Sequence, residues 1–263
     1  MQKKSIISLD FFESIHEKDS YHEKITNPKL VAQKILNHFI VLVLFSFIYG
    51  AVMGCYNGFQ QAISSGVKVP VLFVLIVLIC FPALYVIQTI LGSKLTLPQM
   101  LSVILSGFVM TTTIMVSFAP IVIFFLITGS SYAFIQLLHV GVFTVGGLFG
   151  MHSIIEALKF SCEKKNVYPK VGVQVFRIWI FILAFVGAQL SWSLRPFIGA
   201  KDLPFELFRK QEGNFYQAVL VSTVRMMGGK KSKPKTQEKQ IVVKPNVTAD
   251  STAVEINDEK QEK

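Results

Sequence analysis

Residues 69–91 read VPVLFVLIVLICFPALYVIQTIL, a stretch without a charged side chain that is long enough to cross the hydrocarbon core of a bilayer. The apolar character continues in both directions. From Ile35 to Ile155 the only charged side chains are Lys68 and Lys94, and there is no carboxylate. A water-soluble domain carries charge on about a quarter of its residues. The chain is therefore predicted to be an integral membrane protein.

Five stretches have the length and composition of membrane spans: residues 36–56, 69–91, 101–127, 132–155 and 173–190. Backbone polar groups in lipid must pair inside the protein, and these stretches lack the alternation of β-barrel strands. We therefore expect an all-α fold, a polytopic transmembrane helical bundle of about five spans. The short turn at Gly129, Ser130 and Ser131 makes the third and fourth spans antiparallel neighbours.

Composition divides the chain into four parts. Residues 1–34 form a polar N-terminal segment, residues 35–191 the transmembrane helical domain, residues 192–227 an interfacial aromatic and basic segment, and residues 228–263 a charged tail. Large apolar side chains are too rare in the tail to offset the entropy lost on folding, so the tail is expected to be disordered.

Positive charges near the spans predict the orientation, because cytoplasmic loops are enriched in Lys and Arg. With a cytoplasmic N-terminus, Lys94, Lys164 and Lys170 are inside and the outer loops contain only Lys68. Five spans then place the tail outside, where its lysines lack the anionic inner leaflet. Either the tail is translocated despite its charge or the number of spans differs by one.

No residue pattern predicts an enzyme. The chain has no GxSxG, HExxH or CxxC motif, no pair of intramembrane aspartates and no phosphate-binding glycine loop. Its three cysteines are scattered, which favours neither a disulfide framework nor a metal site. The formal net charge is +10, and the excess basic residues are in loops and a tail beside hydrophobic spans. Membrane lipids, rather than nucleic acid, are therefore the expected partners. No cofactor is expected.

Small residues at helical spacing predict close packing between helices. In the first span they recur every four residues, and in the fourth span a group of glycines shares one arc of the helix: Ser46, Gly50, Gly54 and Gly58, then Gly146, Gly147 and Gly150. The face of the first span is predicted either to pack against other spans of the same chain or to form a homodimer.

Polar side chains form a stripe on the third span and another on the fourth. The two stripes either interlock through hydrogen bonds or line a narrow hydrated path. His139 is the only ionisable side chain near mid-depth, where it either donates to a carbonyl or has a functional role. The residues of this possible polar path are Gln99, Ser106, Thr113, Ser117, Gln136 and His139.

Two parts of the sequence resemble a known group. Residues 69–93 (VPVLFVLIVLICFPALYVIQTILGS), followed by MLSVILSG, SFAPIVIFF and SYAFIQLLHV, resemble uncharacterised bacterial polytopic proteins and more remotely the Yip family. Residues 189–219 (QLSWSLRPFIGAKDLPFELFRKQEGNFYQAV) resemble a motif after the last span of that bacterial group. The resemblance implies about five packed spans, a cytoplasmic N-terminus and, for this chain, the bacterial inner membrane.

The resemblance singles out a post-span motif of Arg195, Pro196, Phe197, Gly199, Phe205, Arg209, Asn214 and Phe215, which can also be interpreted as an aromatic and basic belt. The acidic N-terminal motif of eukaryotic Yip proteins is missing before Lys34. This difference argues against a role in vesicle traffic. No catalytic residue follows from the resemblance.

Two functions fit these observations. The first is a scaffold or partner-recruiting component of a membrane complex, with protein partners or self-association. The second is a channel or facilitator with a polar path between the third and fourth spans. A lipid-modifying enzyme would have to rely on His152, Glu156, Lys159 and Arg195, the candidate polar groups at a membrane face. The sequence identifies no partner, solute or oligomeric state.

Overall fold

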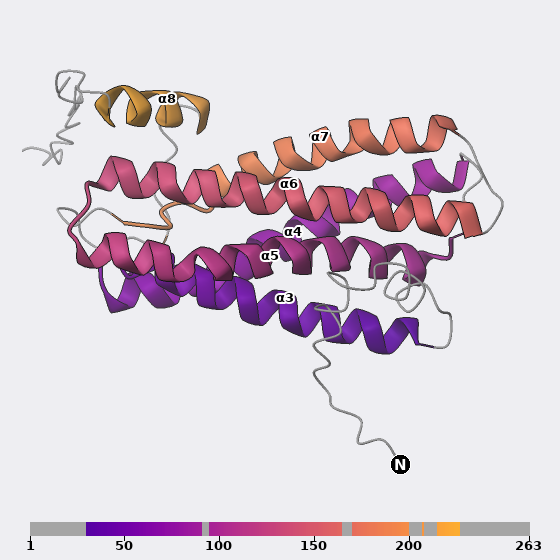
Figure 1. Ribbon diagram of the computed structural model, residues 1–263, viewed down its shortest axis with the longest axis horizontal. Helices are drawn as coiled ribbons and strands as arrows, with labels where there is room; N and C mark the ends of the chain where they lie inside the picture. The colour runs from indigo at the N-terminus through magenta and orange to yellow at the C-terminus, as the bar shows by residue number, and fades with distance from the viewer. Residues whose placement is uncertain (1–29, 91–94, 165–169, 200–206, 208–214, 227–263) are drawn as a thin grey trace, which may run out of the picture. The chain divides into compact units, whose positions relative to one another are not determined.

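The computed structural model describes residues 30–90, 95–164, 170–199, 207 and 215–226. In these ranges the chain forms α-helices and no strand, which confirms the predicted all-α bundle. Figure 1 shows the helices, whose bounds are α3 (Val31–Gly54), α4 (Phe59–Ile90), α5 (Leu97–Ile127), α6 (Tyr132–Lys164), α7 (Lys170–Ser193) and α8 (Phe215–Met226). The predicted disorder of the tail falls outside the described residues.

Four of these helices, α3 to α6, are long and apolar enough to cross a membrane, and α7 contains a shorter apolar stretch, Ile178–Ser193. At a rise of 1.5 Å per residue, the 32 residues of α4 span roughly 48 Å. This exceeds the hydrocarbon thickness of about 30 Å, so the ends of such a helix reach the headgroup layers. The chain is a multi-pass membrane protein.

The long helices contact one another in a closed order. α3 packs against α4 and α5, α5 packs against α6, α4 packs against α7, and a smaller α6 and α7 contact completes the ring. Figure 1 shows α5 between α3 and α6, with α8 next to α6. Short connections join α3 to α4 and α5 to α6, so each of these pairs is an antiparallel hairpin.

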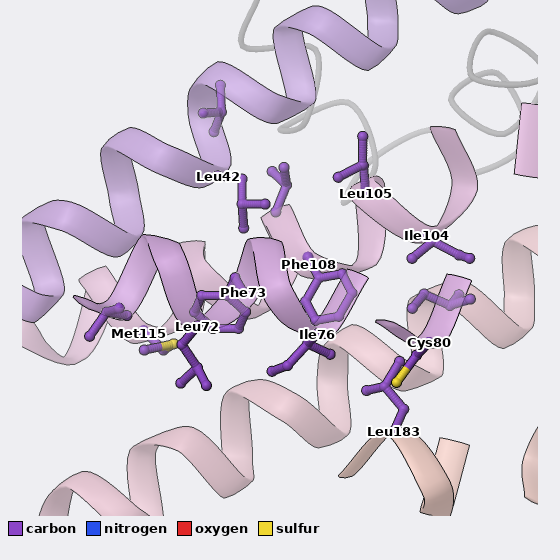
Figure 2. Close-up of a cluster of buried hydrophobic side chains, with 14 of the residues drawn as sticks. Leu42, Leu72, Phe73, Ile76, Cys80, Ile104, Leu105, Phe108, Met115 and Leu183 are labelled. Atoms are coloured by element: carbon purple, nitrogen blue, oxygen red, sulfur yellow. The ribbon is translucent and has the colours of Figure 1, made fainter. Parts of the chain in front are cut away.

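Aromatic rings fill the centre of the ring of helices. Phe73 of α4 stacks on Phe143 of α6, with 6.3 Å between ring centroids, and meets the edge of Phe108 of α5 at 5.7 Å. Tyr49 of α3 meets Phe143 edge-on, with 5.9 Å between ring centroids. Figure 2 shows Phe73 and Phe108 among the surrounding aliphatic side chains of α4 and α5. These contacts join four helices into one core.

Large apolar side chains cover the outside of the spans, and polar side chains lie inside, as expected for a protein surrounded by lipid. Large apolar side chains are exposed along the spans, among them Leu78 of α4, Phe124 of α5, Leu148 of α6 and Phe181 of α7. Polar side chains such as Ser46, Gln61 and His139 are buried inside. A face of exposed apolar side chains over several helices would be unstable in water but is stable against acyl chains.

The helices differ from the predicted spans mainly at their ends. α4 begins at Phe59, ten residues before the predicted start, so the prediction of Lys68 in an outer loop is wrong. Lys68 lies inside the helix and is 5% exposed. The sequence reasoning ended the span at the charge, because a buried lysine without partners is costly in lipid. α8 lies within the predicted interfacial segment.

Candidate functional site

The small residues of α3 bring its backbone against α4. A Cβ atom added at Gly50 would lie 2.5 Å from the carbonyl oxygen of Ser65, and one at Gly54 would lie 2.3 Å from that of Gln61. Ser46 is fully buried, and its hydroxyl donates to the carbonyl of Leu42 on its own helix. This face of α3 is therefore occupied by α4 of the same chain.

Gly58 does not extend this face. α3 ends at Gly54, and Gly58 lies in the connection to α4 with φ of 123°, where an added Cβ atom would meet nothing within 4 Å. The four-residue spacing holds in the sequence, but the chain leaves the helix before the fourth member. The positive φ, which suits a residue without a side chain, is the role that the structure gives Gly58.

A second close approach joins α5 and α6. A Cβ atom at Gly150 would lie 2.0 Å from the hydroxyl oxygen of Thr111 and 2.5 Å from the carbonyl oxygen of Gly107. One at Gly146 would lie 3.0 Å from the carbonyl oxygen of Thr111, whereas one at Gly147 would meet nothing within 4 Å. Along this stretch the two backbones leave no room for a column of water.

The polar residues of α5 bond locally. Thr113 donates to the carbonyl of Val109, Ser106 to Val103 and Ser117 to Thr113. Gln99 is a capping residue: its side-chain oxygen accepts from the backbone N–H of Thr96 at the start of α5. These bonds satisfy the hydroxyls within the helix, so the polar stripe of α5 does not interlock with α6 through them.

The polar residues of α6 bond to other elements. His139 is 2% exposed, and its Nδ1 lies 2.8 Å from the hydroxyl oxygen of Tyr49 on α3. Gln136 accepts a hydrogen bond from Ser222 of α8 at 3.1 Å. The two stripes therefore diverge, since the partners of α6 lie on α3 and α8 and those of α5 lie on α5 itself.

The most concentrated polar contact is made by three side chains of α4, Gln61, Ser65 and Lys68, which we name the α4 clamp. All three are buried. They follow one another at helical spacing, so they share one face of the helix. This face meets the segment after α7, which contains the first residues of the post-span motif.

The α4 clamp holds backbone carbonyls. Gln61 Nε2 lies 3.0 Å from the carbonyl oxygens of both Pro196 and Phe197, and the hydroxyl of Ser65 donates to Phe197 as well. Lys68 Nζ donates to the carbonyl of Pro196 at 3.0 Å and also to that of Leu207. A single apolar helix thus supplies the donors for a segment more than 120 residues away in sequence.

Contacts beside the α4 clamp complete the attachment. Gly199 has φ of 67°, and a Cβ atom there would lie 2.7 Å from Nδ2 of Asn57 in the α3 to α4 connection. Pro196 follows a cis peptide bond, and Arg195 lies over the ring of Trp192 with 3.6 Å to the centroid. The post-span motif therefore contacts the α3 and α4 hairpin through Pro196, Phe197 and Gly199.

Of the remaining members of the motif after Gly199, the structure describes one. Phe205, Arg209 and Asn214 are outside the described residues, and Phe215 is the first residue of α8. Sequence reasoning missed the α4 clamp. Its signal was present, because Lys68 is the one charged residue of α4 and Gln61 and Ser65 precede it by seven and three residues on the same face.

The polar group predicted near the end of the fourth span is a local side-chain contact within α6. His152 Nε2 lies 3.4 Å from Glu156 Oε1, one helical turn away, and His152 is well exposed. The pair does not converge with Arg195, which lies beyond the C-terminal end of α7. Within the described part of the chain, no group of three or more His, Cys, Asp or Glu side chains is arranged to hold a metal ion.

Comparisons with protein-family models, curated proteins and solved structures find no match to this chain. The resemblance to bacterial polytopic proteins and to the Yip family stays a prediction.

Proposed function

We propose that the protein is a non-enzymatic membrane scaffold that holds its post-span segment at one end of the helical bundle for contact with a protein partner. The observation that carries this proposal is the α4 clamp. Gln61, Ser65 and Lys68 bind main-chain carbonyls of Pro196, Phe197 and Leu207, so the segment is held by its backbone. Pro196 is buried and Phe197 packs against the core, whereas the side chain of Leu207 is left to make other contacts.

Leu207 illustrates this arrangement. Its carbonyl accepts from Lys68, whereas its side chain is 54% exposed. A segment fixed in this way loses less conformational entropy when a partner binds than a free segment does.

The packing of α5 and α6 supports a scaffold over a path between these helices. Gly107 and Gly150 bring the backbones together, and the hydroxyls of Ser106 and Thr113 bond within α5. A hydrated path needs polar groups that are free to face water along its length.

Site-specific photocrosslinking in the producing cells tests the proposal. A photoreactive residue at Leu207 is expected to give a discrete protein adduct, and one at Leu78, an exposed position on α4, is expected to give none. Lys68→Met should reduce the Leu207 adduct because the segment loses its attachment. Equal adducts at both positions, or none at Leu207, would contradict the scaffold.

Solute flux through liposomes containing the purified protein provides the opposing test. The scaffold is expected to conduct no solute, and His139→Ala and Thr113→Val are expected to leave the background leak unchanged. Flux that depends on either side chain would establish the facilitator instead.

A further inference from the structure

The α4 clamp leaves one of its own polar atoms unpaired. Gln61 is 1% exposed, and its Nε2 lies 3.0 Å from the carbonyl oxygens of both Pro196 and Phe197. Carbonyl oxygens only accept, so the amide presents its nitrogen to them and keeps its oxygen for another donor. Among the described residues, this oxygen has no hydrogen-bond partner. The clamp therefore contains a buried acceptor that the attached segment does not use.

A second polar atom on the same face of α4 is also unpaired. Ser64 follows Gln61 by three residues and precedes Lys68 by four, so all three side chains share one face of the helix. Ser64 is buried, and its hydroxyl oxygen has no partner in the part of the chain that the structure describes. Unpaired polar atoms in a buried site destabilise it. A hydrogen-bond donor is what this site lacks.

The attached segment has no donor at the residue that the clamp binds most closely. The carbonyl of Pro196 accepts from both Gln61 and Lys68, but proline has no backbone N–H. A primary amide such as that of Gln61 is complementary to a whole peptide group, because its nitrogen donates to the carbonyl and its oxygen accepts from an N–H. The segment therefore fills only the carbonyl half of this arrangement.

The clamp recognises main chain, which indicates the chemistry of the missing donor. Its hydrogen bonds to the segment end on carbonyls, which every residue carries, and main-chain bonds of this kind give affinity for extended peptides. The ammonium group of Lys68 would repel a cationic donor, so a neutral N–H fits best. Gln61 lies in the first turn of α4, at an end that reaches the headgroup layer, where a polypeptide can approach.

We infer that the α4 clamp is a binding site for the main chain of an extended polypeptide, and that the segment with Pro196 and Phe197 occupies it until a partner's segment replaces it. A partner segment with a residue other than proline at this position provides the N–H that Gln61 Oε1 lacks. The inference rests on the proposed scaffold function. It names the partner's chemistry and the step that admits the partner, which is release of the post-span segment.

Peptide binding to the full chain in detergent micelles, measured by fluorescence anisotropy with empty micelles as background, tests the inference. The probes are labelled peptides with the sequence of residues 193–208, in which Pro196 is retained, replaced by alanine, or replaced by N-methylalanine, which also lacks an N–H. The alanine peptide is expected to bind about fivefold more tightly than the other two, the effect of one hydrogen bond. Equal binding of the alanine and N-methylalanine peptides would overturn the inference.

A disulfide that fixes the chain's own segment shows whether the peptide enters the clamp. A Cβ atom at Gly199 would lie 2.9 Å from Cβ of Asn57, so Asn57→Cys with Gly199→Cys, in a chain whose own cysteines are replaced by serine, can hold the segment in place. Oxidation is expected to weaken binding of the alanine peptide by about tenfold or more, because the segment can no longer leave, and reduction should restore it. Binding that ignores the disulfide would place the peptide outside the clamp and overturn the inference.

The photocrosslink at Leu207 separates the two proposals. That adduct depends on the attached segment and needs no exchange at the clamp. Absence of peptide binding together with a Leu207 adduct would therefore reject the exchange and retain the scaffold, whereas absence of both would reject the scaffold as well.

Discussion

Lys68 is the one charged residue in α4, and it lies about three turns inside the helix. An ionisable side chain at such a position is costly unless it is paired within the protein. Here its donors meet the carbonyls of Pro196 and Leu207. A lysine is suited to this role because its long side chain reaches past the helix surface and donates several hydrogen bonds.

Replacing Lys68 by Met is expected to leave the carbonyl of Pro196 without this donor and to destabilise the folded protein by about 1–3 kcal/mol. A lower unfolding temperature in detergent would report the loss. Lys68→Arg, which keeps the charge and the donors, should recover part of it. Lys159→Met, at a partly exposed position on α6, is the matched control and should change little. Equal effects at the two lysines would contradict the role of the α4 clamp.

Tyr49 and His139 form a buried polar contact between α3 and α6. Replacing Tyr49 by Phe removes the hydroxyl that lies 2.8 Å from Nδ1 of His139 and retains the ring that packs on Phe143. A loss of about 1 kcal/mol in unfolding free energy is expected, between the mean for a membrane hydrogen bond and the cost of an unpaired buried group. Tyr85→Phe, a partly buried tyrosine of α4, should be nearly neutral. An unchanged stability in both variants would show that the contact contributes nothing.

At the scale of the helices, both hairpins are stabilised by the same kind of contact, a close approach of two backbones at glycine. Lipid gives apolar side chains no drive to associate, so close backbone contact supplies the packing energy. Gly50 and Gly54 make this contact in the α3 and α4 hairpin, and Gly107 and Gly150 make it in the α5 and α6 hairpin. The pairs explain why small residues recur in these helices.

Gly150 and Gly147 offer a matched test within one helix. Gly150→Ala places a methyl group 2.0 Å from the hydroxyl oxygen of Thr111 and against the backbone at Gly107, so α5 and α6 must separate. We expect a cost of about 1–3 kcal/mol, typical of overpacking. Gly147→Ala meets nothing and should be neutral or slightly stabilising, since alanine is the better helix former. The order of the two unfolding temperatures in detergent decides the prediction, and the reverse order would refute it.

The attachment of the post-span segment to the α3 and α4 hairpin can be tested by a disulfide. A Cβ atom at Gly199 would lie 2.9 Å from Cβ of Asn57, so Asn57→Cys with Gly199→Cys should form a cross-link on mild oxidation, after small shifts to a normal Cβ separation. Val52→Cys with Gly199→Cys is the control pair, at a position one turn further into α3. Absence of the cross-link in the folded protein would place the segment elsewhere.

At the scale of the whole molecule, the number of membrane crossings determines whether the two ends of the chain lie on the same side. An odd number places them on opposite sides. If α3 to α7 all cross, the start of α3 and the end of α7 lie on opposite sides of the membrane. The positive charges between spans predict that the start of α3 is cytoplasmic. The contacts of Pro196 and Gly199 with the start of α4 and its connection to α3 support a fifth crossing, since they bring the end of α7 to that end of the bundle.

Reporter fusions at each end of the full chain test this topology. A reporter active only in the cytoplasm should be active at the N-terminus and inactive after residue 263, and an exported reporter should give the opposite pattern. The same activity at both ends would mean an even number of crossings and would require α7 to lie on the membrane rather than across it.

Much of the fold could be predicted from the sequence, because lipid acts on each helix separately. The absence of charge between Ile35 and Ile155 and the lengths of the apolar stretches were sufficient to predict a helical membrane protein of about five spans. The pairing of the third and fourth spans followed from the short turn at Gly129. These properties depend on residues that are neighbours in sequence or on the contact of each helix with lipid. Both can be judged from the order and composition of the residues alone.

Only the tertiary structure decided the partners of the buried polar groups. Lys68 was assigned to a loop by its charge, yet carbonyls from a segment after α7 allow it to lie inside α4. His139 was placed in a stripe facing α5, yet its partner is Tyr49 of α3. A hydrogen bond needs a donor and an acceptor within about 3 Å, and residues far apart in the chain meet at that distance only after the helices have packed.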